Sequence, residues 1–179
     1  MLTQDQRLEW IRELLTGNTE SPPYRVAGTL LLLYAQPLVK AAAIPMRNVL
    51  VAPDGLSLQL GVTPSPVPEP FAELLRAHIR NRPNLRTGGA DNPWLFPGYR
   101  PGEHLHPSTL MDRLRALGID LLGARNTALR ELVAQVPPPV VAEMLGYSDK
   151  VVHRHAALAA QPWARYAKTK PGSTDPLSV

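Results

Sequence analysis

The sequence predicts a mainly α-helical domain that carries one small β-hairpin, an α+β arrangement. Most of the chain places apolar residues at helical spacing, whereas residues 49–62 place Asp54-Gly55 between two short apolar runs, the pattern of a hairpin turn. The composition is globular, with 44% hydrophobic and 19% charged residues. Of the 179 residues, we expect 1–167 to form one domain and 168–179 to be a disordered tail.

The first helices follow from caps and prolines. Thr3 can cap a helix over residues 4–15, and Pro22-Pro23 can start an almost wholly apolar helix that extends to residue 36. A helix this apolar should be buried at the centre of the domain. Pro37 and Pro45 bracket a shorter helix over 38–44.

The second half of the chain returns to helices. Residues 63–70, TPSPVPEP, predict an extended connector, because alternating prolines disfavour both helix and sheet pairing. An amphipathic helix over 71–82 is followed by a long Pro/Gly-rich stretch at 83–107. A further helix is expected to start at a Ser108 cap and end at Gly118. Three more are expected over residues 124–135, 137–145 and 149–160.

The basic charge lies mainly in the second half of the chain. The net charge is +4, but residues 1–75 hold 5 Lys or Arg against 7 Asp or Glu, whereas residues 76–179 hold 14 against 8. Arginine accounts for 15 of the 19 basic residues, and its planar guanidinium suits bidentate contacts to phosphate. A polyanion partner fits this distribution, and so do ordinary solvated helix faces.

Cysteine and membrane signals are missing from the sequence. Without cysteine, neither a disulfide framework nor a thiolate zinc site can form, which is compatible with a cytoplasmic protein. The longest apolar run, TLLLLYAQPLV, is too short to cross a bilayer. His104 and His106 share a spacing found in some metal sites, but no further ligand accompanies them, so we expect no metal and no cofactor.

One segment, ARNTALRELVAQVPPPVVAEMLGYSDKVVHRHAAL, resembles the signature of tyrosine recombinases, the phage integrase family. That family has an Arg-His-Thr step on a buried helix, a short break, and an apolar helix ending in Leu-Gly-His-Ser. Arg125-Asn126-Thr127 is similar to the first motif, residues 137–139 to the break, and Leu145-Gly146-Tyr147-Ser148 to the last. The resemblance covers about residues 24–167 and implies the fold of the recombinase catalytic domain.

The resemblance also implies a set of catalytic groups, and most positions carry other residues here. In the family, a tyrosine attacks a DNA phosphodiester, two arginines and a His or Trp bind its oxygens, a hairpin lysine protonates the leaving oxygen, and a second His assists proton transfer. Arg125 stands for the second arginine, and Leu122 replaces the His three residues before it. Tyr147 replaces the His of Leu-Gly-His-Ser and keeps a hydrogen-bond donor.

The remaining groups are not matched. The first arginine should fall at Pro37 or Leu38, and the nearest cation, Lys40, is about half a helical turn out of register. No lysine lies between Lys40 and Lys150, so the hairpin lysine is absent. The nucleophile position falls on Ala156, between His155 and Ala157. The sequence therefore predicts a degenerate, inactive relative.

Two residues keep an active enzyme open as an alternative. Tyr166 could act as a displaced nucleophile, although it lies about ten residues too late, and His155 could form a phosphohistidine. Arg125 also has a structural alternative, since it could pair with Glu131, Glu143 or backbone carbonyls.

These observations favour a DNA-binding protein that uses its basic face on the backbone of double-stranded DNA. We expect arginines in and around the signature to contact the DNA. They are Arg76, Arg80, Arg82, Arg86, Arg113, Arg115, Arg125 and Arg130. The alternative is a protein-interaction module that self-associates through the C-terminal helix, using the apolar face of VVHRHAALAA, followed by Trp163 and Tyr166.

Overall fold

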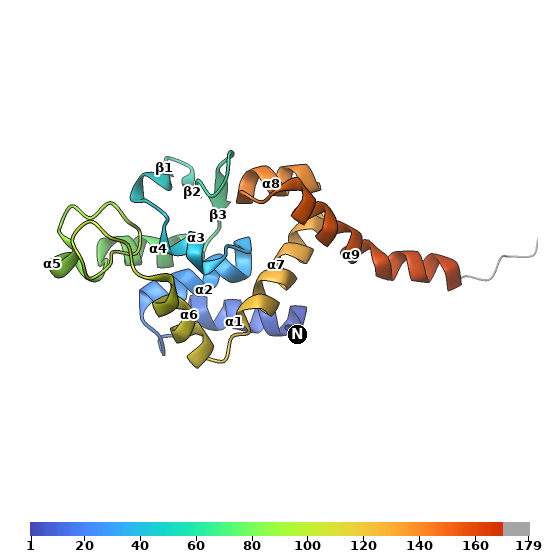
Figure 1. Ribbon diagram of the computed structural model, residues 1–179, viewed down its shortest axis with the longest axis horizontal. Helices are drawn as coiled ribbons and strands as arrows, with labels where there is room; N and C mark the ends of the chain where they lie inside the picture. The colour runs from blue at the N-terminus through green and yellow to red at the C-terminus, as the bar shows by residue number, and fades with distance from the viewer. Residues whose placement is uncertain (170–179) are drawn as a thin grey trace, which may run out of the picture.

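The protein is built around one buried helix, α2, with other helices and a small sheet packed over it (Figure 1). The computed structural model describes residues 1–169, and their side chains as far as residue 161. In chain order the elements are α1 (Gln4–Thr16), α2 (Pro22–Tyr34), α3 (Leu38–Ala42), the 3-10 helix η1 (Met46–Asn48), β1 (Val49–Ala52), β2 (Gly55–Leu58), β3 (Ser65–Val67), α4 (Phe71–Arg80), α5 (Leu85–Gly88), α6 (Pro107–Ala116), α7 (Leu121–Gln135), α8 (Pro138–Leu145) and α9 (Asp149–Thr169).

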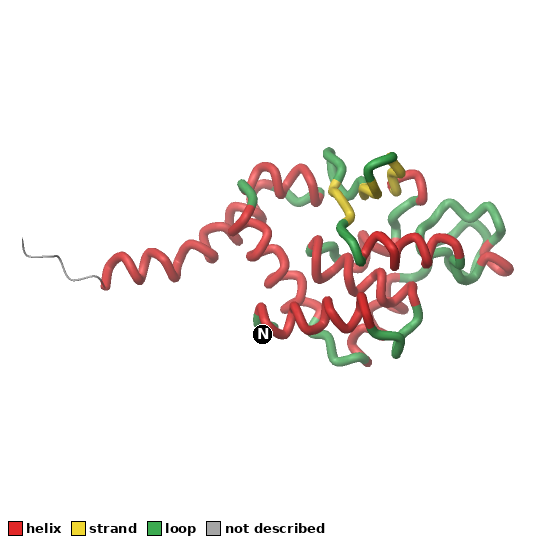
Figure 2. The backbone as a smooth tube through the Cα atoms, turned by 180° about the vertical axis from the view of Figure 1, so that it is seen from behind, coloured by secondary structure: helices red, strands yellow, loops and turns green. Residues whose placement is uncertain are grey.

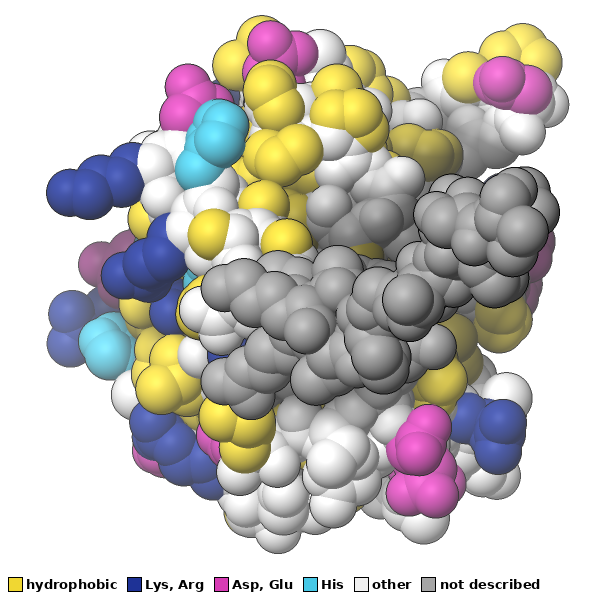
Figure 3. Space-filling model, turned by 90° about the vertical axis from the view of Figure 1, so that its right-hand side faces the viewer, with side chains coloured by type: hydrophobic (Ala, Val, Ile, Leu, Met, Phe, Trp, Pro, Cys, Tyr) yellow, Lys and Arg dark blue, Asp and Glu magenta, His cyan; other side chains and the backbone are white. Residues whose placement is uncertain are grey.

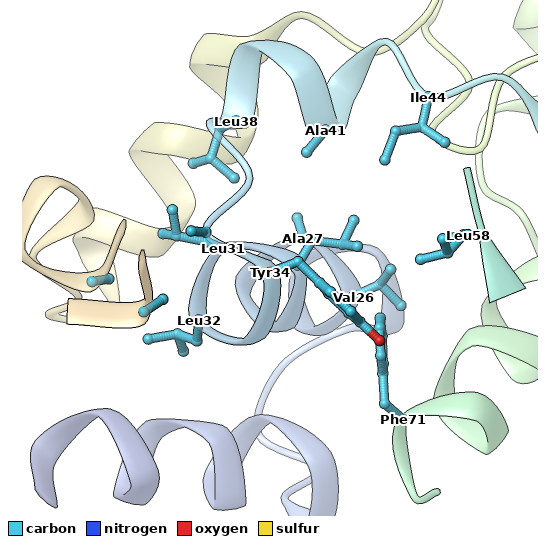
Figure 4. Close-up of a cluster of buried hydrophobic side chains, with 14 of the residues drawn as sticks. Val26, Ala27, Leu31, Leu32, Tyr34, Leu38, Ala41, Ile44, Leu58 and Phe71 are labelled. Atoms are coloured by element: carbon cyan, nitrogen blue, oxygen red, sulfur yellow. The ribbon is translucent and has the colours of Figure 1, made fainter. Parts of the chain in front are cut away.

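The predicted burial of α2 is confirmed. Its side chains are buried around the whole circumference, and α1, α3, α4, α6 and α7 all pack against it. In Figure 4, side chains of α2 such as Val26 and Leu31 meet residues from α3, from the sheet and from α4. Tyr34 closes one end of this cluster, since its ring lies 6.2 Å from that of Phe71 and its hydroxyl donates to the Pro66 carbonyl at 2.7 Å. Burial raises the pKa of Tyr34.

The hairpin is also confirmed, and its turn lies where the sequence places it. β1 and β2 pair antiparallel with Val49 opposite Leu58; Pro53 and Asp54 form the turn, and Gly55 is the first residue of β2. Gly55 has φ +146°, a backbone region that only glycine adopts without strain. Leu56 and Leu58 of β2 point into the core, as their alternation predicts.

The prediction of an unpaired connector over residues 63–70 was wrong. Ser65–Val67 form β3, which pairs antiparallel with β2 and completes a sheet of order β1-β2-β3. Pro66 is tolerated because β3 is an edge strand, where a missing N–H can face away from the ladder. The Tyr34 hydroxyl bonds the carbonyl of the same proline, which fixes the strand on α2.

Several helix ends differ from the predicted ones. His106, not Ser108, caps α6: its ring nitrogen accepts from the Ser108 N–H at 3.2 Å, and Pro107 takes the first helical position, where its missing N–H costs nothing. α7 starts earlier than residue 124 because Asp120 caps it through the Gly123 N–H. α9 extends to Thr169 and projects away from the body (Figures 1 and 2). Residues 170–179 of the expected tail lie outside the described residues.

The Pro/Gly-rich stretch contains only the short helix α5, and polar side chains that bond its backbone carbonyls hold it in place. Arg82 donates to the carbonyls of Asn92 (2.8 Å) and Trp94 (2.6 Å). His78 on α4 is fully buried against Phe96, and its Nε2–H donates to the Leu95 carbonyl at 2.8 Å. Within the described residues, no helix combines the length and apolar character needed to cross a bilayer.

The burial of His78 predicts a loss of stability in mild acid. Burial lowers its pKa to about 4, whereas the unfolded chain should titrate near the ordinary value of about 6.5. The contribution of His78 is therefore fully present above about pH 6.5 and is lost as the pH falls toward 4, by up to about 3 kcal/mol. Denaturant unfolding at a series of pH values measures this loss.

A matched pair of variants isolates the effect. His78→Gln keeps an N–H donor for Leu95 but cannot titrate, so the free energy of unfolding should vary less between pH 6.5 and 4 than in the wild type. His153→Gln, at an exposed histidine of α9, should keep the wild-type pH dependence. Equal pH dependence in His78→Gln and the wild type would contradict the assignment.

Candidate functional site

The turn between α2 and α3 is tied to the turn between α8 and α9, far apart in the sequence. The buried Gln36 side chain donates from Nε2 to the Leu145 carbonyl at 3.1 Å. The Tyr147 hydroxyl donates to the carbonyl of Ala35. Ala35 itself has φ +52°, a left-handed conformation that costs an alanine on the order of 1 kcal/mol. These contacts hold the end of α2 in one geometry.

Lys40 and Arg125 bring positive charge to this junction. The Lys40 ammonium donates from Nζ to the Gly146 carbonyl at 2.9 Å and lies 5.5 Å from the centre of the Tyr147 ring. Burial raises the pKa of Tyr147, and the positive charge of Arg125 opposes part of that rise. Gly146 has φ +71°, and a Cβ there would approach the backbone of Leu60 on the sheet side. Glycine is therefore required where α8 ends.

Arg125 lies in the second turn of α7, half buried. Among the side chains that the structure describes, none forms an ion pair with it, so the expected alternative pairing with Glu131 or Glu143 is not present there. The helix itself is fixed by Asp120 at its cap and by the Thr127 hydroxyl, which donates to the Leu2 carbonyl at 2.8 Å. The helix that carries Arg125 is thus held in place, and the Arg125 guanidinium has no ion-pair partner among the described side chains.

His155 of α9 is buried beside α7. Burial lowers its pKa, and the charges of Arg154, Arg130 and Arg125 lower it further. Its Nδ1 and the Nε of Arg130 are buried without a hydrogen-bond partner among the described residues. Because burial and three neighbouring arginines disfavour the protonated form, we expect His155 to be neutral at neutral pH.

The position expected for the first arginine and Leu122, at the position of the histidine that assists proton transfer, line an apolar hollow. This α3–α7 hollow of about 270 Å³ is bounded chiefly by Leu38, Val39, Met111, Arg115, Leu122 and Arg125. Val39 is 57% exposed and Leu122 is 61% exposed, so both present hydrocarbon to solvent next to Arg125. Sequence analysis missed Val39, because a lone valine in a short helix carries no functional pattern.

On the sheet side of the junction, the hairpin region supplies amide side chains and no lysine, and the only lysine of the hollow there is Lys40 from α3. A second hollow of about 290 Å³ is lined by residues that include Lys40, Asn48, Gln59 and Gly146. The Gln59 side chain donates from Nε2 to the carbonyls of Gly61 and Val62, both at 2.7 Å. An amide can donate hydrogen bonds but cannot serve as a general acid, because it does not titrate in the accessible range.

The two positions considered for a nucleophile lie on α9. Ala156 is half buried and has no attacking group. Tyr166 belongs to the projecting part of the helix, and its side chain lies outside the described side chains. The structure brings together four residues that the sequence predicted only as separate remnants. Lys40 lies against the Tyr147 ring, and the charge of Arg125 acts on both Tyr147 and His155.

Five of the arginines expected to contact DNA already have partners within the fold. Arg76 lies 2.9 Å from Glu69, Arg80 lies 3.5 Å from Glu73, and Arg82 bonds backbone carbonyls. Arg113 lies 2.7 Å from Glu20, whose side chain is almost fully buried. That carboxylate has a lowered pKa: burial is the largest single effect and would raise it, but the hydrogen bonds from Arg113 and Ser21, together with the charge of Arg113, outweigh burial.

Arg115 is the fifth, since it is exposed and lies 3.4 Å from Asp112. Of the other three, Arg86 is exposed on α5, and Arg125 and Arg130 are half buried on α7. At the end of the molecule from which α9 projects, Lys and Arg side chains gather along one edge (Figure 3). In the part of the chain that the structure describes, no group of three or more His, Asp or Glu residues is arranged to hold a metal ion.

The Tyr147 contact predicts a measurable contribution to stability. Tyr147→Phe removes the donor to the Ala35 carbonyl and should lower the free energy of unfolding by about 1–2 kcal/mol, because a partly buried acceptor loses its partner. Tyr99→Phe, at a tyrosine that is 65% exposed, is the control and should change it by less than about 0.5 kcal/mol. Urea unfolding of both variants tests this, and equal losses would contradict a structural role for the Tyr147 hydroxyl.

Comparison with known proteins supports the fold assignment. A solved chain described as XerH site-specific recombinase, bound to a palindromic difH substrate in a post-cleavage complex, superposes with a TM-score of 0.68 at 14% identity. The match covers 94% of this chain and 52% of that chain, so this chain spans about half its length. No protein-family model and no curated protein matches this sequence. The fold, mainly helical with a small antiparallel sheet, is thus similar to that of a tyrosine recombinase catalytic domain, as the sequence predicted.

Proposed function

We propose that this chain is a DNA-binding, catalytically inactive relative of the tyrosine recombinases, with residues 1–167 acting as one integrase-like domain. The observation that carries the proposal is Arg125, which stands on a fixed helix and lines a hollow without an ion-pair partner among the described side chains, while the expected nucleophile is Ala156 and the expected histidine is Leu122. The likeness in fold to a recombinase bound to DNA supports the same class of partner.

The inactivity follows from what surrounds Arg125. Strand cleavage needs an attacking oxygen, a proton donor for the leaving oxygen, and several donors for the charge that develops on the phosphate. Ala156 has no oxygen, Leu122 has no titratable group, and the Tyr147 hydroxyl is already committed to a backbone carbonyl. Arg125 alone can bind a phosphate but supplies no route to cleave it.

The contacts to DNA are proposed for the arginines least committed to the fold. Arg125 and Arg130 lie on α7, and Arg86 is exposed on α5. Arg76, Arg80, Arg82, Arg113 and Arg115 remain in the proposed set as weaker contributors, because a phosphate would have to compete with their present partners. Long-range attraction from the basic second half of the chain would add to these contacts.

Binding to random-sequence duplex DNA should therefore be strongly salt dependent. If three phosphates are contacted, affinity should fall by about 40-fold between about 50 and 200 mM salt. Arg125→Ala should weaken binding by about tenfold and reduce the salt slope by about 1. Fluorescence anisotropy with labelled duplex measures both, and Arg12→Ala, at an exposed arginine of α1, is the matched control.

A denaturing gel on the same samples tests the inactivity. Salt-dependent binding without a covalent adduct supports the proposal. An adduct that disappears in Tyr166→Phe would instead establish an active recombinase with a displaced nucleophile, and an acid-labile adduct lost in His155→Ala would point to phosphohistidine. Absence of binding even at low salt would remove DNA as the partner.

A second function, self-association, is favoured by an apolar groove and by the projecting helix. The α2–α8 groove has a volume of about 320 Å³ and an almost wholly apolar lining, chiefly Leu33, Val67, Leu132, Val136, Val141 and Met144. α9 extends beyond the body and exposes Leu158 on its described part. An apolar helix from one copy and an apolar groove on another would be complementary.

Analytical ultracentrifugation in the absence of DNA tests this second function. A wild-type dimer that dissociates in Leu158→Glu, but persists in Val62→Glu, would support docking of α9. Val62 is 79% exposed on the loop after β2 and is therefore a matched position away from α9. A wild type that stays monomeric at every concentration would exclude this function.

A further inference from the structure

The α3–α7 hollow presents apolar surface that the fold itself does not use. Apart from its two arginines, every side chain that lines it is apolar. Val39 from α3 and Leu122 from α7 stand on opposite elements of the hollow, and each exposes more than half of its surface. Exposed hydrophobic residues that converge on one concave site are a feature of surfaces that bind a partner.

Two guanidinium groups add positive charge to the same hollow. Arg115 is exposed, and its only described acidic neighbour, Asp112, lies at 3.4 Å on the same solvent-exposed helix face. Arg125 has no ion-pair partner among the described side chains. The lining therefore combines hydrocarbon with guanidinium groups that can bind a carboxylate in a bidentate manner.

A DNA backbone matches the positive charge of the hollow but not its apolar surface. A phosphate could contact Arg115 or Arg125, but it would leave Val39, Leu122 and Met111 without an apolar partner. Burying a phosphate against hydrocarbon would also remove its hydration without replacing it, which is costly. A protein segment can match both features: its apolar side chain would enter the hollow, and a neighbouring carboxylate would contact the guanidinium groups.

We propose that the α3–α7 hollow docks a segment of a partner protein in which a bulky apolar side chain stands next to an aspartate or glutamate. The occupant is identified by charge complementarity and by the volume of about 270 Å³, which holds one large side chain and its flanking backbone. This interaction does not depend on the DNA binding proposed above, but it uses Arg115 and Arg125 of the same set, so peptide and DNA would compete for them.

The experiment is a selection from a random peptide library displayed on phage, using the whole chain as bait. The Val39→Ser/Leu122→Ser double variant serves for counter-selection, because it removes the apolar surface without altering the charge. Peptides retained by the wild type should carry a large apolar residue next to Asp or Glu. A synthetic peptide of the most enriched sequence should bind at least tenfold more weakly to the double variant and to Arg125→Ala.

The control is Val51→Ser, at a valine of β1 that is 81% exposed and lies outside the hollow. It should bind the peptide within twofold of the wild type, and circular dichroism of each variant checks that the fold is kept. Failure to enrich any peptide, enrichment of basic peptides, or equal binding to the double variant would overturn the proposal. A wild-type dimer abolished by the double variant would also overturn it, by making a second copy the occupant. The assay contains no DNA, so its result is independent of the duplex-binding test.

Discussion

The burial of α2 is the constraint on which the rest of the structure depends. A helix that is apolar around its whole circumference must be covered on every side, and α1, α4, α6 and α7 provide that cover. Polar groups at the edges fix the covering helices in place: Arg7 of α1 donates to the Leu32 carbonyl at 2.7 Å, and Tyr34 reaches β3. Elements distant in sequence consequently meet at the end of α2.

The candidate site is a consequence of how that helix ends. The left-handed Ala35 turns the chain sharply into α3, which places Lys40 and Val39 on opposite sides of the junction, one against Tyr147 and the other in the α3–α7 hollow. The strain of the turn is offset because its carbonyl is bonded by Tyr147 and the next residue, Gln36, is bonded to the end of α8. Stability and site geometry therefore rest on the same contacts.

Local signals in the sequence were sufficient for most of the fold. Asp54-Gly55 predicted the hairpin, and the apolar character of the helix that begins at Pro22 predicted the centre of the core. β3 could not be predicted, because its pairing depends on an edge position that only the assembled sheet defines. The motif containing Arg125 and Tyr147 located the junction, but the exposure of Val39 and Leu122 depends on how three helices pack and has no local signature.

The proposal that Arg125 is a recombinase arginine without its catalytic partners has a definite physical meaning. A guanidinium binds a phosphodiester before reaction and during it, so on its own it contributes affinity that is nearly the same in both states. Only groups whose interaction strengthens as charge develops, together with a nucleophile and an acid, would convert that affinity into rate. With Ala156, Leu122 and the committed hydroxyl of Tyr147 around it, Arg125 is suited to holding an anion. The apolar wall beside it then favours recognition over chemistry, because hydrocarbon excludes water without supplying or accepting a proton.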